Sequence, residues 1–242
     1  MKPLAIDLFC GLGGWTEGLL AEGYYVVGFD IEQHVYGEHR YPAQLVIQDV
    51  LTLHGKQFKD AALIVASPPC QAYSYRAMPW KRAKALPPPD NSLFEACFRI
   101  QREASEAAGR HIPMVVENVK GAQKWVGRAR WNFGSFYLWG DVPALMPIAI
   151  ARKNNGGSWF AIGSPGQKET GKNPVQELTA AGVKNKDADG YERTHPNAFG
   201  WKKPRTSSHS KARKFASAMV AKIPIALSRH IAASWKPMQA AA

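Results

Sequence analysis

The chain has 242 residues, enough for one full α/β domain with a sizeable core, and its hydrophobic fraction of 45% is that of an ordinary globular protein. The sequence lacks an apolar run of roughly 18 residues that could span a membrane, and it lacks an N-terminal signal-peptide pattern. Its three separated cysteines suggest neither a disulfide framework nor a zinc ribbon, and they fit a reducing cytoplasm. A net charge of +12 indicates a polyanionic partner, most simply nucleic acid, although composition alone leaves open a basic protein without one.

The first 120 residues alternate between apolar strands and helices. A strand at residues 4–10 leads through a glycine-rich turn into a helix at 16–22, for which Gly23 is the predicted C-cap. The predicted order continues with a strand at 24–29, a short helix at 33–40, strands at 45–47 and 61–66, a helix at 93–109 and a strand at 114–116. Strands that alternate with helices predict an α/β fold with a doubly wound, mostly parallel sheet.

The composition changes after about residue 150. Residues 151–205 are rich in Gly, Asn and Lys with scattered aromatics, and they predict loops with one short helix at 173–181. A helical pattern returns from residue 210, and Pro224 divides it into 211–222 and 225–234. We therefore expect a main domain at 1–150, a small irregular insertion at 151–208 and C-terminal helices at 209–242.

Three polar features at the ends of the first three strands describe a nucleoside site. They are the turn Gly11-Leu12-Gly13-Gly14, the carboxylate of Asp30 and the carboxylate of Asp49. Because the carboxyl ends of parallel strands meet at one crevice, Asp30 would take the two ribose hydroxyls and Asp49 an exocyclic amine. Each feature alone is more often an ordinary turn, loop or cap residue, but together they describe an adenosine site. The chain lacks a phosphate-binding Gly-Lys-Ser/Thr loop, so an adenosine cofactor without a phosphate grip indicates S-adenosylmethionine.

A cysteine and a glutamate follow the next two strands. Cys70 stands in Pro68-Pro69-Cys70-Gln71, directly after an apolar run, which is the position of a nucleophile more than of a packing residue. Glu117 closes the apolar strand at 114–116, where desolvation would raise its pKa and let it donate a proton near neutral pH. Cys10 and Cys97 are interpreted as core residues.

Residues 71–92 combine cations with interleaved aromatic side chains. This composition suits a mobile loop that contacts phosphates and an unstacked base, although an ordinary solvated loop stays possible on sequence alone. Its basic and aromatic residues are Tyr73, Tyr75, Arg76, Trp80, Lys81, Arg82 and Lys84.

These motifs, in this order, resemble the DNA (cytosine-5) methyltransferases. The matching segments are Asp7 to Gly14, Asp30-Ile31-Glu32, Asp49, Pro68-Pro69-Cys70-Gln71 and Glu117-Asn118-Val119. The resemblance covers about residues 1–120 and 210–235, where 225–234 looks like a C-terminal motif that packs back beside the first. Residues 131–143 resemble short, phage-encoded members.

The resemblance implies a Rossmann-like, class I S-adenosylmethionine-dependent fold and a methyl transfer to C5 of a cytosine flipped out of double-stranded DNA. In that mechanism Cys70 adds to C6 of the base and Glu117 acts at N3. Asp30 would bind the ribose and Asp49 the adenine amine, and the other residues implied to line the cofactor are Asp7, Phe9, Gly11, Gly13, Ile31 and Pro69. The residues implied to contact DNA are Gln71, Ser74, Arg76, Lys81, Arg82 and Asn118, the last of which would also hold the loop at Glu117.

The sequence departs from the family in its C-terminal motif, which lacks the usual Gly-Asn before Lys222, and at two places that concern DNA. The Gln-x-Arg-x-Arg segment that contacts the flipped base is missing, and the nearest candidates are Arg128 and Arg130, between which the sequence does not choose. The target-recognition region is reduced to residues 151–205, which predicts a short recognition sequence or relaxed specificity. A monomer without a metal is expected. Two alternatives stay open: the same chemistry on RNA or a pyrimidine nucleotide, and a non-catalytic nucleic-acid-binding module.

Overall fold

The computed structural model describes residues 2–74, 85–146, 214, 218–219 and 221–237. The chain divides into two units, residues 1–150 with 222–242 and residues 151–221, and only the first is described below. The helix predicted at 173–181 and the boundary predicted at residue 208 lie outside the described residues, so the proposed domain limits stay predictions.

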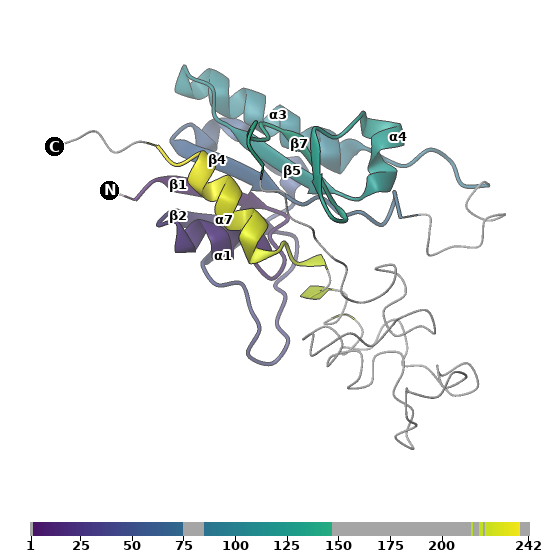
Figure 1. Ribbon diagram of the computed structural model, residues 1–242, viewed down its shortest axis with the longest axis horizontal. Coiled ribbons are helices and arrows are strands. Elements are labelled where there is room, and N and C mark those ends of the chain that lie inside the picture. The colour runs from purple at the N-terminus through teal and green to yellow at the C-terminus, as the bar shows by residue number, and fades with distance from the viewer. Residues whose placement is uncertain (1, 75–84, 147–213, 215–217, 220, 238–242) are drawn as a thin grey trace. The chain divides into compact units, whose positions relative to one another are not determined.

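A seven-stranded sheet in the order β3-β2-β1-β4-β5-β7-β6 forms the centre of the described part (Figure 1). The strands are β1 (Leu4–Leu8), β2 (Tyr25–Asp30), β3 (Gln44–Ile47), β4 (Ala61–Ala66), β5 (Met114–Asn118), β6 (Trp131–Phe133) and β7 (Phe136–Gly140). The first five pair in parallel, whereas β7 runs antiparallel to both β5 and β6. The predicted α/β fold with a doubly wound, mostly parallel sheet is confirmed.

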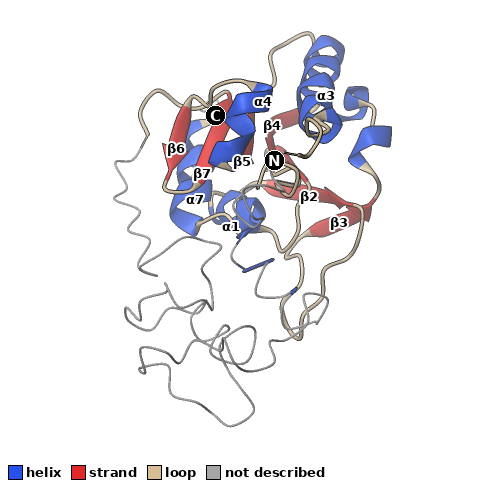
Figure 2. Ribbon diagram, turned by 90° about the vertical axis from the view of Figure 1, so that its right-hand side faces the viewer, coloured by secondary structure: helices blue, strands red, loops and turns tan. Residues whose placement is uncertain are grey.

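Helices cover both faces of this sheet. The α-helices are α1 (Gly14–Ala21), α3 (Ser92–Ala108), α4 (Gln123–Val126) and α7 (Ile225–Ser234), and the 3₁₀ helices are η1 (Val50–Thr52), η2 (Gly55–Phe58) and η4 (Lys120–Ala122). Figure 2 shows α1 and α7 on one side of the sheet and α3 on the other. The buried face of α3 follows a helical spacing through Phe94, Cys97, Ile100 and Ala104. These side chains pack on the apolar strands in one core that the sequence spacing predicts.

Two predictions about local structure need correction. The helix predicted at 33–40 is wrong, because these residues form an extended loop with a single bridge between Tyr36 and His39. Gly37 adopts a positive φ of 61° in the middle of it, and the exposed Val35 shows that the segment has no apolar face to bury. The hairpin of β6 and β7 was missed, although the two-residue link Gly134-Ser135 between aromatic runs is a hairpin signal.

Helix α7 packs closely on α1 through glycine. A Cβ on Gly18 would lie 2.2 Å from Ser228 Oγ and 2.5 Å from the backbone nitrogen of Arg229. The contact is reinforced by the ion pair of Lys222 with Glu17 at 2.5 Å and by that of Arg229 with Glu22 at 2.8 Å. The absence of a side chain at Gly18 therefore sets how near the C-terminal helix can approach.

Gly18→Ala should lower the free energy of unfolding by about 1–3 kcal/mol, because the added methyl meets backbone atoms that cannot rotate away. Urea denaturation of the full chain measures it. Alanine is otherwise the better helix former by about 1 kcal/mol, so a stabilised variant would contradict the close contact. Ala21→Gly, at an exposed position of the same helix, measures the contribution that the difference in helix propensity between alanine and glycine makes to the free energy of unfolding.

Candidate functional site

The order of strands reverses between β1 and β4, and the carboxyl ends of the parallel strands meet beside that point. β2 and β3 extend the sheet on one side of β1, and β4 and β5 extend it on the other. In open α/β sheets such a switch point leaves a crevice where ligands bind. The register pairs Leu8 with Ala66 and Ala66 with Val116, so the next residues, Phe9, Ser67 and Glu117, reach the same edge of the sheet. Glu117 is still paired there, with Leu138 of β7.

The glycine turn after β1 is held by Asp30. Gly11 and Gly13 have positive φ values of 51° and 77°, and Phe9 shares this left-handed conformation at 57°. The Gly11 N–H donates to Asp30 Oδ2 at 2.8 Å, and the Ile31 N–H donates to Oδ1 at 2.8 Å. Burial raises the pKa of Asp30, but hydrogen bonds from His34 and from the Gly11 backbone outweigh it and leave the pKa below its usual value. Asp30 is therefore an ionised carboxylate at the end of β2.

A chain of buried hydrogen bonds joins Asp7, Thr16 and Tyr41 next to this turn. Thr16 Oγ1 donates to Asp7 Oδ2 at 2.6 Å and lies 2.6 Å from the Tyr41 hydroxyl. Asp7 is 1% exposed. Burial raises its pKa to about 7, while the bond from Thr16 acts in the opposite direction and the charge of Asp30 adds to the rise. Asp7 Oδ1 is buried and has no hydrogen-bond partner among the residues that the structure describes, which is a costly state for a carboxyl oxygen.

Ile31 and Asp49, which are also predicted to contact the nucleoside, follow β2 and β3 at the carboxyl edge of the sheet. Ile31 follows Asp30 and is 69% exposed, an unusual state for a large apolar side chain. Asp49 caps η1 by accepting from the Leu51 N–H at 2.9 Å through Oδ1. Leu51 is also exposed and was not predicted from the sequence. The available sign of it in the sequence is its position two residues after Asp49, which is weak evidence.

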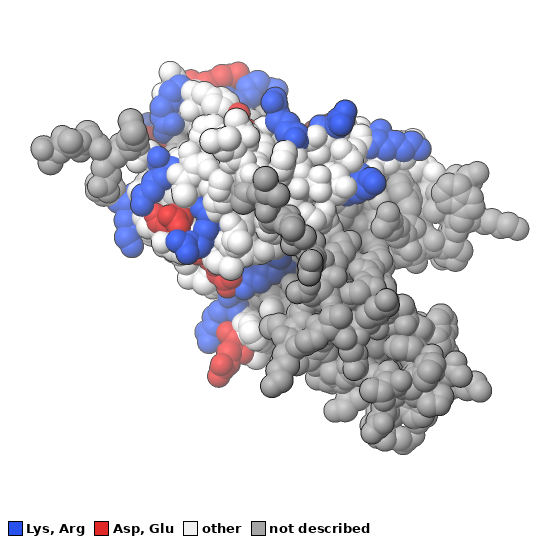
Figure 3. All heavy atoms as spheres, viewed as in Figure 1, with Lys and Arg blue, Asp and Glu red and all other residues white. Residues whose placement is uncertain are grey.

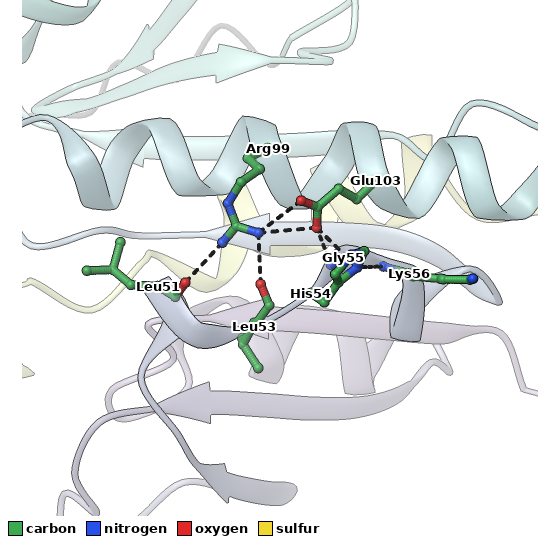
Figure 4. A network of polar contacts seen from close by, with 7 residues as sticks. All are labelled: Leu51, Leu53, His54, Gly55, Lys56, Arg99 and Glu103. Carbon is green, nitrogen blue, oxygen red and sulfur yellow. Dashed lines mark hydrogen bonds and ion pairs between the residues drawn. The ribbon is translucent and has the colours of Figure 1, made fainter.

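A clamp on α3 fixes the segment that carries Asp49 (Figure 4). Arg99 donates to the carbonyl oxygens of Leu51 and Leu53 and to the Glu103 carboxylate. Glu103 in turn accepts from the Gly55 N–H at 2.6 Å, and a Cβ on Gly55 would lie only 2.1 Å from the Ile100 carbonyl oxygen. These contacts hold η1 and η2 against the helix.

The structure separates Cys70 from the other two cysteines. Cys10 and Cys97 are 5% and 0% exposed, whereas Cys70 is partly exposed beyond the end of β4. Burial raises the pKa of the Cys70 thiol, the Ser74 hydroxyl lowers it, and the charge of Glu117 raises it again. Cys70 follows β4, and Glu117 lies near the end of β5, the strand that pairs with β4. Cys70 rests as a thiol until a base or substrate removes its proton.

Glu117 has a strongly perturbed carboxyl group. It stands at the end of β5 with part of its surface exposed, yet desolvation of the carboxyl raises its pKa to about 8, opposed by a hydrogen bond from Ser67. Ser67 Oγ also accepts from Trp15 Nε1 at 3.0 Å. Neither Ser67 nor Trp15 was predicted. The position of Ser67 at the end of an apolar run was the available signal.

Asn118 and Tyr73 are interior residues. Asn118 is 1% exposed, its Nδ2 donates to the Pro68 carbonyl at 2.9 Å and its Oδ1 accepts from the Val119 N–H. This side chain therefore ties β5 to the loop of Cys70 and does not face a DNA strand, which corrects its place among the expected DNA contacts. Tyr73 is also buried and donates to Asn91 Oδ1, so it belongs to the core.

The other predicted contacts are exposed or lie outside the described residues. Gln71 and Pro69 are exposed beside Cys70, and Ser74 donates to the Cys70 carbonyl at 2.9 Å. Arg128 and Arg130 are exposed, and within the described part of the chain neither guanidinium contacts Glu117. The Arg130 N–H donates to the Leu138 carbonyl of β7. Arg76, Lys81 and Arg82 lie outside the described residues.

Basic side chains are spread over the described surface visible in Figure 3, with acidic ones among them. Among the described residues, none of the helices is both long and apolar enough to cross a membrane. The same part of the chain holds no group of three His, Cys, Asp or Glu residues arranged to bind a metal ion.

A family model for C-5 cytosine-specific DNA methylases matches residues 4–127, just over half of the chain. The chain belongs to this family. The match includes the glycine turn, Asp30, Asp49, Cys70 and Glu117, so the resemblance inferred from these motifs is confirmed at the level of the family.

Solved structures of methyltransferases also resemble this family member. A protein described as a DNA modification methyltransferase encoded within a prophage of E. coli is 25% identical over 52% of this chain and 34% of its own, with a TM-score of 0.36. S. pombe Dnmt2 is 20% identical over 51% and 38%, and Entamoeba histolytica EhMeth 17% identical over 51% and 40%, both at 0.36. The matched part of this chain thus covers little more than a third of the length of these proteins. A separate search of curated proteins found no match.

The exposure of the three cysteines predicts their reactivity. In the native protein a chromogenic disulfide reagent should label Cys70 and leave the buried Cys10 and Cys97 unlabelled. Because the pKa of Cys70 is raised, the labelling rate should go on rising at pH values where a free cysteine has already levelled off. Cys70→Ser should abolish native labelling, and unfolding of the unsubstituted protein should expose all three thiols. Rapid native labelling of Cys70→Ser would contradict the assignment.

Proposed function

We propose that this chain transfers a methyl group from S-adenosylmethionine to C5 of a cytosine flipped out of double-stranded DNA. The observation that carries the proposal is the pair of Cys70 and Glu117 at adjoining strand ends, each with a raised pKa, the Glu117 charge adding to that of Cys70. A thiol that must become a nucleophile and a carboxyl that holds a proton near neutral pH are the two groups this chemistry needs.

The residues at the neighbouring strand ends fit S-adenosylmethionine. Asp30 Oδ1 accepts from the Ile31 and Glu32 N–H groups. Oδ2 accepts from the Gly11 N–H and keeps a further lone pair for a ribose hydroxyl. Ile31 offers an exposed apolar surface to an adenine ring, and Asp49 Oδ2 is available to the adenine amine. A Cβ on Gly11 would meet nothing within 4 Å, so the turn leaves open space, which Phe9, Gly13 and Pro69 would border.

Asp7 supports the same assignment from inside the turn. Its unpartnered Oδ1 and its pKa of about 7 indicate a carboxyl that would be stabilised by a nearby positive charge. When bound, S-adenosylmethionine supplies both that charge and an electrophilic methyl group on its sulfonium. The role of the protein is to hold the donor beside the base and to activate the carbon that receives the methyl.

Cys70 would activate C5 by covalent addition. Its thiolate forms a bond to C6 of cytosine, and the electron pair of the C5–C6 double bond becomes available at C5 for methylation. Glu117 gives its proton to N3, so that no negative charge accumulates on the ring. Loss of the C5 proton to a base then expels Cys70 as thiolate, and Glu117 recovers the N3 proton.

The substrate class rests on the family and on charge. The excess of twelve positive charges favours a polymer of phosphates over a free nucleotide. The reacting carbons lie within the base stack of duplex DNA, so the base must be turned out of the helix to reach Cys70. Gln71, Ser74, Arg76, Lys81 and Arg82 remain the proposed DNA contacts, and Arg128 or Arg130 the proposed contact to the far side of the base.

The purified chain, incubated with labelled S-adenosylmethionine, should methylate duplex DNA, and RNA and dCMP should give little or no product. Cys70→Ser should lower the rate of methyl transfer by at least about a thousandfold, because a serine hydroxyl is a far weaker nucleophile than a cysteine thiolate. Transfer that survives this substitution would contradict the covalent mechanism. Transfer to RNA or dCMP in preference to DNA would contradict the substrate assignment.

The pH dependence of kcat/KM follows from the same pair. The active form has an ionised Cys70 and a protonated Glu117, so it carries one proton, and the form with both groups protonated is inactive. With a Glu117 pKa of about 8 and a Cys70 pKa above its usual value, kcat/KM should rise about tenfold per pH unit below about pH 8 and then level off.

Glu117→Gln serves as the control for this profile. Glutamine does not titrate, so the residual kcat/KM of the variant should keep rising beyond about pH 8 toward the pKa of the thiol. A wild-type profile that is flat between about pH 6 and pH 8 would contradict the assigned protonation states.

A further inference from the structure

Ser67 connects the first helix of the fold to the carboxyl group of Glu117. It is the first residue beyond β4, and its backbone N–H donates to the Leu8 carbonyl at 3.2 Å. Its hydroxyl oxygen lies 3.0 Å from the indole nitrogen of Trp15, and the same hydroxyl, at the end of the strand next to that of Glu117, lowers the pKa of the Glu117 carboxyl. Ser67 is also three residues before Cys70, so it lies between the two proposed reacting groups in the chain and in the fold.

The register of the sheet brings these groups together. Ala66 pairs with Val116 in the parallel β4–β5 ladder, so Ser67 and Glu117 occupy the next position on adjacent strands. Neighbouring strands are about 4.8 Å apart, which is within reach of a serine and a glutamate side chain that meet between them. The contact therefore depends on the backbone register and not on a flexible loop.

The chemistry of the three side chains fixes the direction of the hydrogen bonds. An indole N–H can only donate, so Ser67 Oγ must be the acceptor in its bond with Trp15. The single hydroxyl hydrogen of Ser67 is then free to be directed at Glu117, and a hydroxyl that accepts one bond becomes a stronger donor in the next. Ser67 can therefore accept from Trp15 and donate toward Glu117 at the same time.

Trp15 is itself rigidly held. It is 2% exposed in the first turn of α1. The preceding Gly14 has no room for a side chain, because a Cβ there would lie 2.4 Å from the backbone nitrogen of Ile223. Hydrogen-bond donors fixed by such packing cost little reorganisation when a reaction proceeds.

We propose that Ser67, oriented by Trp15, is a positioning residue that fixes the Glu117 carboxyl beside Cys70 and supplies its hydrogen bond in the ionised state. For its catalytic consequence this inference rests on the proposed function. Within the described residues, the polar group that opposes the desolvation of this carboxyl is the Ser67 hydroxyl. Without Ser67, desolvation would keep the proton on Glu117 more tightly, and the carboxyl would be free to rotate away from the base.

The test is a titration of the Glu117 carboxyl by carbon-13 NMR in the full chain without DNA or cofactor, with Glu117→Gln assigning the signal. Ser67→Ala should move the midpoint upward by about one pH unit, because a hydrogen bond to the charged form is lost. Ser67→Thr, which keeps the hydroxyl, should restore it. Trp15→Phe should give a smaller upward movement, and in the double variant it should add nothing to Ser67→Ala.

Trp235→Phe is the matched control. It removes an indole hydrogen bond of the same kind, to the Asp141 carbonyl at 2.9 Å, and it should leave the Glu117 midpoint unchanged. In methyl-transfer assays Ser67→Ala should lower kcat about tenfold with little change in KM for DNA, and Ser67→Thr should recover most of the loss.

The two readouts separate this inference from the proposed function. A Glu117 midpoint unmoved by Ser67→Ala, or effects of Trp15→Phe and Ser67→Ala that simply add, would overturn the positioning role even if methyl transfer is normal. A midpoint that moves as expected in a protein that transfers no methyl group would support the contact with Glu117 and overturn the proposed function and the catalytic consequence together.

Discussion

The parallel pairing of β4 with β5 is the constraint on which the site depends. It brings the ends of two apolar strands to the same edge of the sheet, and it aligns Ala66 with Val116. The residues that follow are then forced into proximity although about fifty positions separate them in the chain. The Asn118 amide closes the same arrangement from behind, since its bond to the Pro68 carbonyl fixes the loop of Cys70 to the end of β5.

Desolvation gives these groups their chemical character. A glutamate in water loses its proton well below neutral pH, whereas the Glu117 carboxyl has a pKa of about 8 because the surrounding protein disfavours its charge. The same effect opposes ionisation of Cys70. Asp30 shows the opposite outcome at the end of β2, where backbone and His34 hydrogen bonds outweigh burial and keep the carboxylate charged. The same edge of the sheet thus carries a protonated and an ionised carboxyl group, with β1 and β4 between their strands.

Much of this arrangement could be predicted from the sequence, because the decisive residues directly follow apolar runs. Asp30 and Glu117 lie at strand ends and Cys70 lies in the loop just beyond one, and the alternation of strands with helices predicts that such ends meet. Other features depend on partners that are distant in the chain. The bond of Ser67 with Trp15 spans 52 positions, and burial of Asn118 and Tyr73 depends on how the loop folds against β5 and Asn91. The predicted helix at 33–40 failed because spacing alone did not reveal that no face of it would be buried.

The central claim is that Cys70 becomes covalently bonded to the substrate base while Glu117 serves that step. A duplex carrying 5-fluorocytosine tests it directly. Fluorine replaces the C5 hydrogen that is normally lost as a proton, so Cys70 cannot be eliminated and the adduct persists. The account predicts a stable protein–DNA complex that forms only with S-adenosylmethionine present, that maps to Cys70 by mass spectrometry, and that forms much more slowly in Glu117→Ala. A trapped complex attached to another residue, or none with a protein that methylates unmodified DNA, would contradict it.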